Sequence, residues 1–193
     1  PAFKYNPAKY VMLPTSARQR RPLIEERLVK LAEYAETTPV NSILIGTAET
    51  GIICSGISFQ YAREVIPDAS FLKLGMTYPL PRRLIASFAA GVKRIFVIEE
   101  LDPFMEEIIR SFGVTVTGKE IFPRVGELSV AAVAASLRQA GVLPAVSAKV
   151  TLNPIPLPKR PPVLCPGCPH CGAFYVLSTM GQRSRPKSRK GAL

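Results

Sequence analysis

The chain has 193 residues, of which 47% are hydrophobic, and it carries a formal net charge of +11. This apolar content suffices for one well-buried core with appendages, and no apolar run approaches the ~20 residues that span a bilayer. Three of the four cysteines lie close together near the carboxyl end. Such spacing suits a ligand cluster better than a disulfide framework, so we expect a reducing, cytoplasmic compartment.

The positive charge is concentrated towards the two ends of the chain. The final segment has no acid and five basic residues, Arg183, Arg185, Lys187, Arg189 and Lys190. A second basic cluster near the amino end consists of Arg18, Arg20 and Arg21. Between residues 41 and 141 acids and bases are mixed. Because a basic tail meets only the weakest electrostatic criterion for nucleic-acid binding, the pattern favours solvated ends.

Residues 1–40 are predicted to form a connector that ends in an amphipathic helix. The prolines of residues 1–14 disfavour a helix there. From Pro22 onward, apolar residues recur at helical spacing with charges on the other face, so Pro22 is expected in the first turn of a helix. Because the chain begins at Pro1 rather than at a methionine, we expect its amino end to be internal to a longer protein.

Residues 41–147 are predicted to form an α/β domain. Short apolar runs that read as strands cover residues 42–46, 51–56, 69–74, 94–100 and 114–118. They alternate with helical patterns at residues 57–66, 82–91, 102–113 and 127–141. This alternation predicts a three-layer fold with a parallel sheet and right-handed crossovers. Neither GxGxxG nor GxxxxGK[ST] occurs, which leaves the domain without a recognisable nucleotide-binding motif.

Two adjacent acids, Glu99 and Glu100, end the most apolar strand. Paired carboxylates suit acid–base catalysis, but neighbours on a strand point to opposite faces. We therefore expect one to cap the carboxyl edge of the sheet and the other to meet solvent or a basic neighbour. The next helix is expected to start with Asp102 as its cap and Pro103 in its first turn.

Several residues of this domain need no function beyond packing. Cys54 lies in a predicted core strand, where it is expected to be a small buried hydrophobe. Four aromatic residues occupy helical positions that are predicted to face the core, namely Phe59, Tyr61, Phe104 and Phe112.

A proline-rich linker at residues 148–164 marks a domain boundary. A second domain is expected to begin at Cys165 and to be cut short at about residue 180. The basic segment 181–193 is too poor in apolar residues to fold and is expected to be disordered.

The second segment opens with the cysteine motif C-x2-C-x2-C, formed by Cys165, Cys168 and Cys171, with His170 inside it. Soft thiolates at this spacing can hold a metal ion or one edge of an iron–sulfur cluster. Three readings stay open: a loop that contacts a cluster or cofactor in the full protein, a turn without a ligand, and a zinc site. A zinc site would need His170 and the adjacent Cys171 to bind one ion, which is geometrically awkward.

Several strings in series resemble the large (alpha) subunits of the indolepyruvate ferredoxin oxidoreductase family. They are "KYVMLPTSARQRRPLIEERL", "GIICSGISFQYAREVIPDASFLKLGMTYPLP", "VKRIFVIEELDPFMEE", "VGELS" and "RPPVLCPGCPHCG". The likeness runs from about Tyr10 to about Leu177 and keeps the order of the motifs.

The resemblance implies a piece of an enzyme of the 2-oxoacid:ferredoxin oxidoreductase superfamily. Such enzymes oxidatively decarboxylate arylpyruvates, indolepyruvate among them, to aryl-acetyl-CoA, with thiamine diphosphate, Mg²⁺ and [4Fe-4S] clusters as cofactors and ferredoxin as the electron acceptor. A smaller beta subunit is the expected partner. Residues 41–147 would be the domain that resembles the transketolase carboxy-terminal domain, and residues 165–180 the start of the diphosphate-binding domain. We expect this piece alone to be inactive and to bind no cofactor stably.

By resemblance, the residues nearest the cofactor are those that match the family's CPGCPH string: Cys165, Pro166, Gly167, Cys168 and His170. Cys171 stands where the family has arginine, which puts a third thiolate ligand in doubt. The loop with Gly75, Met76 and Tyr78 is expected to have an interface role, because this domain of the family mainly packs against its neighbours. Two alternatives remain, a non-catalytic α/β interaction module and a small protein that binds a metal through its cysteines.

Overall fold

The computed structural model describes residues 3–145 and 163–184. The chain divides into two compact units, Pro1–Ser147 and Ala148–Leu193. None of the helices within the described ranges combines the length and the apolar character needed to cross a membrane. Most of the predicted linker, and the predicted tail from residue 185 onward, lie outside the described residues.

The first unit contains a four-stranded mixed sheet in the order β1-β3-β2-β4. The strands are β1 (Ser42–Leu44), β2 (Thr47–Ser55), β3 (Ala69–Leu74) and β4 (Arg94–Ile98). β2 pairs in parallel with both β3 and β4, as predicted, whereas β1 runs antiparallel to β3. The prediction of a wholly parallel sheet is therefore wrong at β1.

A short connection accounts for the reversed direction of β1. Only two residues, Ile45 and Gly46, separate β1 from β2, whereas a parallel crossover needs about a dozen residues or more. Gly46 turns beside the neighbouring backbone, where an added Cβ would lie 2.2 Å from the carbonyl oxygen of Asp68. The chain can reverse there only because this residue has no side chain.

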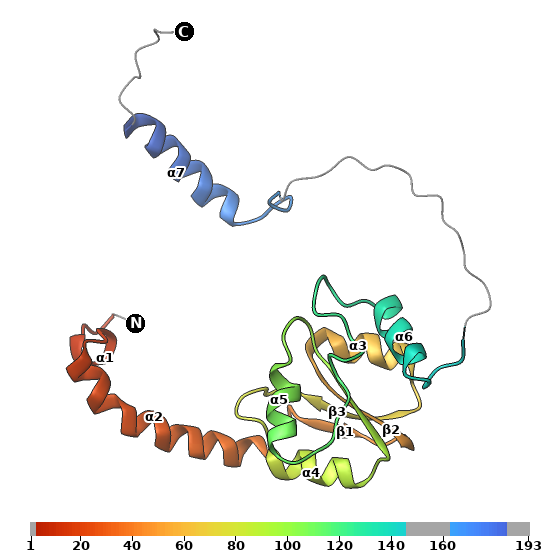
Figure 1. Ribbon diagram of the computed structural model, residues 1–193. Coiled ribbons are helices and arrows are strands. Elements are labelled where there is room, and N and C mark those ends of the chain that lie inside the picture. The colour runs from red at the N-terminus through yellow and green to blue at the C-terminus, as the bar shows by residue number, and fades with distance from the viewer. Residues whose placement is uncertain (1–2, 146–162, 185–193) are drawn as a thin grey trace. The chain divides into compact units, whose positions relative to one another are not determined.

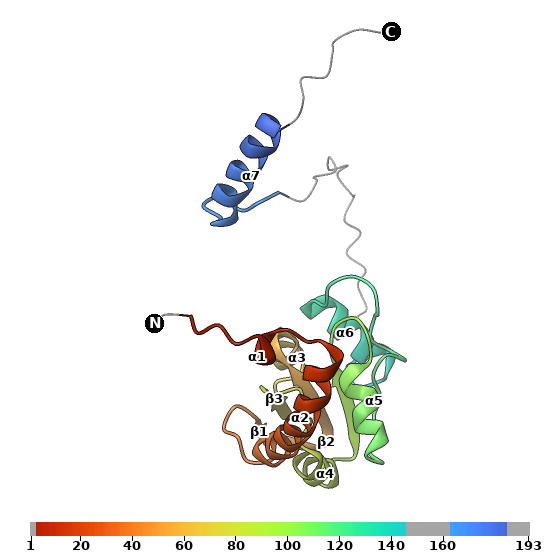
Figure 2. The same cartoon turned by 90° about the vertical axis from the view of Figure 1, so that its left-hand side faces the viewer.

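Helices flank the sheet on both faces. α3 (Gly56–Val65) and α6 (Val130–Gln139) cover one face, while α4 (Arg82–Ala90) and α5 (Phe104–Ser111) cover the other (Figures 1 and 2). All four helices fall where the apolar periodicity predicts them. Ser129 caps α6 by accepting a hydrogen bond from the backbone N–H of Ala132 at 3.2 Å.

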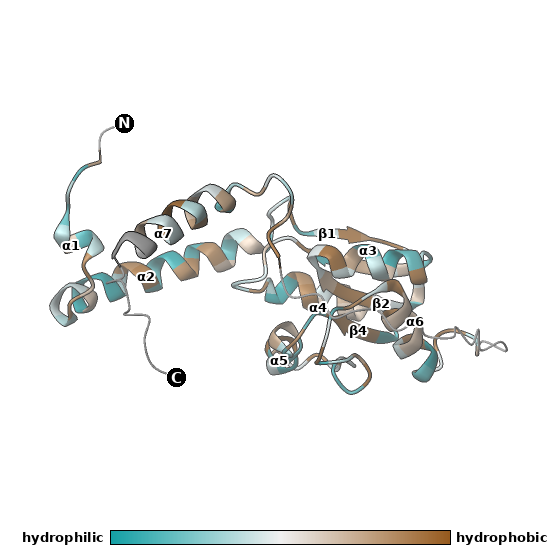
Figure 3. Ribbon diagram, turned by 90° about the horizontal axis from the view of Figure 1, so that it is seen from above, coloured by the Kyte–Doolittle hydropathy of each residue, from teal (hydrophilic) through white to brown (hydrophobic). Residues whose placement is uncertain are grey.

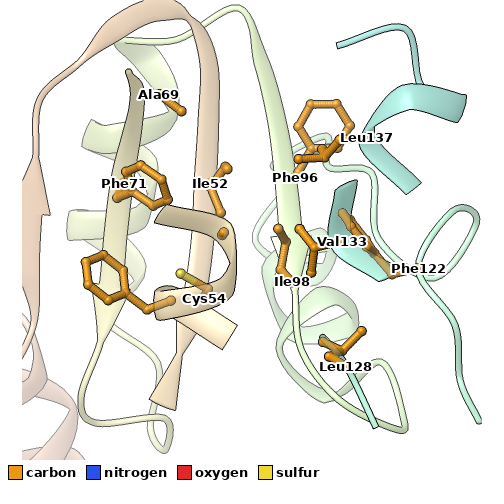
Figure 4. Close-up of a cluster of buried hydrophobic side chains, with 12 residues drawn as sticks. Ile52, Cys54, Ala69, Phe71, Phe96, Ile98, Phe122, Leu128, Val133 and Leu137 are labelled. Atoms are coloured by element: carbon orange, nitrogen blue, oxygen red, sulfur yellow. The ribbon is translucent and has the colours of Figure 1, made fainter. Parts of the chain in front are cut away.

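Each face of the sheet has its own apolar core. On the α3/α6 side, side chains from β2, β3 and β4 meet the two helices, and Phe71, Phe96 and Val133 are at most 1% exposed (Figure 4). Cys54 belongs to this cluster and is fully buried, which confirms its expected packing role. On the other side, alternate residues such as Ile53 meet α4 and α5. Burial on both faces explains why the strands read as continuous apolar runs.

The predicted fifth strand at residues 114–118 is reduced to a single bridge. Thr117 pairs in parallel with Phe96, and its N–H and C=O bond to the backbone of Ile95 and Val97, both at 2.9 Å. The segment thus lies beside β4, but its ladder does not extend. The following Gly118 packs so closely on Glu106 that an added Cβ would lie 2.1 Å from its carboxylate.

The amino-terminal helix is longer than predicted. α2 (Pro14–Ala35) has Pro14 at its first turn and Pro22 inside it, so the expectation that Pro22 begins the helix is wrong. Pro14 fits the first turn equally well. Pro22 has no backbone N–H, and the helix tolerates the loss of the hydrogen bond that this group would donate. A short helix, α1 (Pro7–Tyr10), also forms where none is predicted, because Asn6 caps it by accepting from the N–H of Lys9.

Much of the apolar face of α2 is exposed. Leu23 and Val29 are exposed and Leu31 is half-buried, while Ala35 at the carboxyl end is fully buried. Figure 3 shows the mixed hydropathy of α2 beside the mainly apolar strands of the sheet. The helix is therefore anchored to the α/β domain through its last turn.

In the second unit, α7 (His170–Ser184) begins within the cysteine motif, since Cys171 is its second residue. The helix includes residues 181–184, so the expectation of disorder from residue 181 is wrong for these four residues. The helix continues because "AFYVLSTMGQRS" contains no proline before Pro186.

The packing yields a stability prediction. We expect Leu72→Ala, in the centre of β3, to lower the free energy of unfolding by about 2–5 kcal/mol, because it leaves a cavity between the sheet and the α4/α5 layer. Ile45→Ala is the matched control, since that side chain is 90% exposed, and it should cost under about 0.5 kcal/mol. Urea unfolding of both variants checks this. Equal losses would contradict the assigned core.

Candidate functional site

The carboxyl ends of β2, β3 and β4 lie at one edge of the sheet, because these strands are parallel. Ligands of open α/β sheets commonly bind at this edge. Here it is formed by the start of α3, the loop after β3, and Glu99 and Glu100 after β4. These two acids are the main candidates for catalytic residues in this unit.

Glu99 serves as the cap of α5. Its buried carboxylate accepts hydrogen bonds from the backbone N–H groups of Met105, at 2.8 Å, and Glu106, at 3.0 Å. These donors belong to the first turn of the helix, where no carbonyl of the helix itself can reach them. The expectation that Asp102 caps α5 is wrong, because Pro103 occupies the cap position and no side chain next to the helix bonds there.

A network of charged groups, partly buried and partly exposed, extends from this cap. Glu106 is 3% exposed; its carboxylate accepts from the backbone N–H of Lys119 at 2.8 Å and pairs with Arg110 at 3.0 Å. The Lys119 ammonium donates to the backbone carbonyls of Glu99 and Pro123, and Arg110 also pairs with Glu120. Charged groups that lose water are stable only when such partners replace it.

The burial of these groups shifts their proton affinities. Burial raises the pKa of Glu99, and the two backbone hydrogen bonds from α5 and the charge of Lys119 oppose that rise. Burial lowers the pKa of Lys119, against the charges of Glu99 and Glu106. The polar atoms of both groups are thus engaged in hydrogen bonds within the fold.

Glu100 points to a different neighbour, and its carboxylate accepts from the backbone N–H of Leu128 at 3.1 Å. The expectation that one of the paired acids caps the carboxyl edge is confirmed for Glu99. Glu100 is exposed, so the expectation that the other acid meets solvent is also confirmed, although its carboxylate bonds to a backbone amide as well. The two carboxylates do not converge on a common point, so the arrangement does not form an acid–base pair.

The loop after β3 is held by a residue that the sequence did not single out. The side-chain oxygen of Asn41 accepts from the N–H groups of Gly75 and Met76, both at 3.0 Å, and its amide donates to the carbonyl of Ala35 at 2.8 Å. Asn41 thereby joins the end of α2 to the carboxyl edge of the sheet. No sequence signal marks this role, because an asparagine after a proline-containing turn is ordinary in any loop.

An exposed apolar surface borders this edge, and we call Tyr78, Leu101 and Phe104 the edge patch. The three residues are 59%, 61% and 49% exposed, and the rings of Tyr78 and Phe104 lie 6.4 Å apart between centroids. The expectation that Phe104 faces the core is wrong, because Met105 and Ile109 occupy the inward positions of α5.

Leu101 also adopts a strained backbone conformation, with a φ of +57° that few residues other than glycine adopt. Such a conformation costs about 1–3 kcal/mol and persists only where surrounding structure enforces it. The bonds of Glu99 and Glu100 on one side and α5 on the other supply that constraint.

A cavity of about 240 Å³ lies elsewhere, between β1 and α4. Its walls include Ile43, Ser70 and Phe88, and none of its lining residues is titratable. It therefore offers no acid or base, and it is separate from the edge patch.

The cysteine motif in the second unit forms two successive turns. The N–H of Cys168 donates to the carbonyl of Cys165 at 3.0 Å, and the N–H of Cys171 to the carbonyl of Cys168 at 3.1 Å. Gly167 has a φ of +77°, which the first turn requires. Cys165 and Cys171 are exposed, and the Cys168 sulfur lies 3.3 Å from Nδ1 of His170.

The chemistry of this motif suits soft metals better than Mg²⁺. In the described residues, 3–145 and 163–184, no group of three or more His, Cys, Asp or Glu is arranged to hold a metal ion. The sequence from residue 148 to the end contains no Asp or Glu, whereas Mg²⁺ is held by oxygen ligands such as carboxylates. The thiols fit an iron–sulfur cluster by type, so ligation by Cys165, Cys168 and Cys171 stays a prediction.

The raised pKa of Glu99 gives a testable pH dependence. Because its pKa is raised, Glu99 binds a proton more tightly in the folded chain than in the unfolded chain. This tighter binding stabilises the fold at pH values below the pKa of Glu99 in the unfolded chain. The stabilisation is lost as the pH rises through the pKa of Glu99 in the folded chain. Glu99→Gln removes this dependence. The unfolding free energy of the wild type relative to Glu99→Gln should therefore fall as the pH rises above about 4.3, the ordinary pKa of a glutamate in an unfolded chain.

Urea unfolding at several pH values measures this difference. Glu49→Gln is the control, because the Glu49 side chain is 69% exposed in its pair with Lys93, and it should show little such trend. If the difference between the wild type and Glu99→Gln instead grew with pH, Glu99 would not have the raised pKa.

Comparison with known proteins places these features in context. No protein-family model matches the chain. Indolepyruvate oxidoreductase subunit IorA from Archaeoglobus fulgidus is 35% identical over 188 positions, which cover 91% of this chain and 30% of that subunit. The IorA subunits of Pyrococcus horikoshii and Methanothermobacter marburgensis are 34% and 35% identical, with coverages of 91% and 90% of this chain. The chain thus spans 30% of the length of these relatives.

Among solved structures, the chain is similar to a 2-oxoglutarate:ferredoxin oxidoreductase from Magnetococcus marinus. The TM-score is 0.48 at 15% sequence identity, and the match covers 66% of this chain and 23% of that one.

Proposed function

We propose that this chain, a homologue of the IorA subunit of indolepyruvate oxidoreductase over 91% of its own length, contributes a packing domain to a multidomain oxidoreductase subunit. The observation that carries this proposal is the carboxyl edge of the sheet. There the acidic groups are engaged in the fold, and an exposed apolar patch remains. A surface of this kind is suited to a protein neighbour rather than to a polar substrate.

The domain organisation follows from the same proposal. Residues 1–40 serve as a connector, and residues 41–147 correspond to the domain that resembles the transketolase carboxy-terminal domain. Residues 148–164 form a linker, residues 165–180 begin a thiamine-diphosphate-binding domain, and residues 181–193 form a basic tail. The division into two compact units near residue 147 is compatible with this organisation.

The activity belongs to the complete assembly, which oxidatively decarboxylates arylpyruvates such as indolepyruvate to aryl-acetyl-CoA. Thiamine diphosphate with Mg²⁺ supplies the decarboxylation chemistry, and [4Fe-4S] clusters pass electrons to ferredoxin. We assign no catalytic residue to this chain. Its part in catalysis is to orient neighbouring domains, because a thiamine enzyme must hold both ends of its cofactor in fixed geometry.

We further propose that five residues lie near the cofactor: Cys165, Pro166, Gly167 and Cys168, which form the first cysteine turn, and His170, which begins α7. What supports it is the compact turn itself, in which Gly167 allows the chain to fold back and leaves the thiol of Cys165 exposed. Metal ligation by Cys165, Cys168 and Cys171 is the finer proposal. Iron and sulfide analysis of the anaerobically purified complex, with each cysteine replaced by serine in turn, tests it.

The partners that this function requires are a smaller beta subunit, ferredoxin, CoA and the arylpyruvate substrate. Neither nucleic acid nor a membrane is among them. We place the assembly in the cytoplasm, which suits a chain whose cysteines are free thiols.

A chimeric enzyme tests the packing role. We expect the isolated chain, supplied with thiamine diphosphate, Mg²⁺, CoA and indolepyruvate, to reduce no ferredoxin. The same chain, inserted in place of the matching segment of the Archaeoglobus fulgidus IorA subunit and combined with its smaller subunit, should restore ferredoxin reduction. In that chimera Leu101→Glu should reduce assembly about tenfold or more, because it places a charge in a buried interface.

Val125→Glu is the matched control, since Val125 is 88% exposed and lies outside the edge patch; it should leave assembly unchanged. Turnover by the isolated chain would contradict the proposal. So would a Leu101→Glu chimera that assembles as well as its unsubstituted form.

A further inference from the structure

The motif Cys168-Pro169-His170-Cys171 stands at the start of α7. We propose that Cys168 and Cys171 form a redox-active dithiol whose substrate is a small-molecule disulfide. Two cysteines separated by two residues at the start of a helix are the arrangement found in thiol–disulfide oxidoreductases. This inference does not depend on the packing function proposed above.

The turn brings the two cysteines within bonding range. The N–H of Cys171 donates to the carbonyl of Cys168 at 3.1 Å, which closes a four-residue turn. In such turns the first and last Cα atoms lie within ~7 Å, and disulfides join residues whose Cα atoms are ~4.4–6.8 Å apart. Pro169 restricts the backbone between them. A bond between the two sulfurs therefore needs little change in the chain.

Cys165 offers a rival partner for Cys168, because the N–H of Cys168 closes a similar turn on the carbonyl of Cys165 at 3.0 Å. The position of the Cys168 sulfur favours Cys171. It lies 3.3 Å from Nδ1 of His170, the first residue of α7, and so it is directed towards the helix that carries Cys171.

Both thiols are accessible to a reagent. Cys171 is exposed and Cys168 is half-buried. Cys54, in contrast, is fully buried in the α/β core, and burial raises its pKa to about 12. It is thus expected to stay unreacted while the chain is folded, because the thiolate is the reactive form.

The reaction is a balanced thiol–disulfide exchange with a disulfide RSSR. The Cys171 thiolate attacks one sulfur of RSSR, the RS–SR bond breaks, and the first RS⁻ leaves. The Cys168 thiolate then attacks the Cys171 sulfur of this mixed disulfide, forms the Cys168–Cys171 bond and expels the second RS⁻. The two protons of the cysteine thiols end on the two released RSH molecules, so two thiols are oxidised and one external disulfide is reduced.

The test uses the full chain, first reduced and then incubated with glutathione disulfide and a metal chelator. The products are trapped with acid, alkylated and weighed by mass spectrometry. We expect the wild type to lose two hydrogens in total and to carry no glutathione. Cys171→Ser should lose this product entirely, and Cys168→Ser, which keeps the attacking thiol but lacks the resolving one, should accumulate a mixed disulfide with glutathione.

Cys165→Ser distinguishes the proposed pair from the rival pair Cys165–Cys168, because it removes the rival thiol and keeps Cys168 and Cys171. It should form the internal disulfide as the wild type does. The proposal is overturned if Cys165→Ser abolishes that product, if Cys171→Ser retains it, or if the wild type forms only glutathione adducts.

Discussion

The buried carboxylate of Glu99 determines how the carboxyl edge of the sheet is built. A charge removed from water must find partners, and Glu99 finds them in the first two free amides of α5. Lys119 reaches back to the carbonyl of Glu99, and its own amide bonds to Glu106. One network thereby ties β4, α5 and the segment after Thr117 together. Leaving a buried polar group without its partner typically costs about 1–3 kcal/mol, so these hydrogen bonds hold the three elements together.

This constraint also shapes the surface that the domain offers to its surroundings. Because Glu99 and Glu100 both bond to backbone amides, the edge that usually holds ligands in α/β folds retains no convergent acids. The short bend after Glu100 leaves Leu101 with a positive φ and an exposed side chain, three residues before the exposed Phe104. Strain and apolar exposure at one place both suit the packed interface that we propose.

The sequence predicted the elements better than their connections. Apolar periodicity located α3 to α6 and the parallel strands, because burial is periodic along each element. It missed the antiparallel direction of β1, which depends on a two-residue connection, and the cap of α5, which comes from Glu99 rather than from the adjacent Asp102. Phe104 was wrongly predicted to face the core, because helical spacing identifies the apolar face of a helix but not the rotation of the helix about its own axis. The clamp by Asn41 depends on contacts between distant segments, which no local pattern encodes.

Native-state hydrogen exchange of the Met105 and Glu106 amides tests the central role of Glu99 most directly. Amides in the first turn of a helix normally lack a protein acceptor and exchange quickly. We predict that in the wild type both amides exchange as slowly as those in the middle of β4, and that Glu99→Ala removes this protection while β4 stays protected. Fast exchange of both amides in the wild type would contradict the account, because the carboxyl edge would then be held by something other than Glu99.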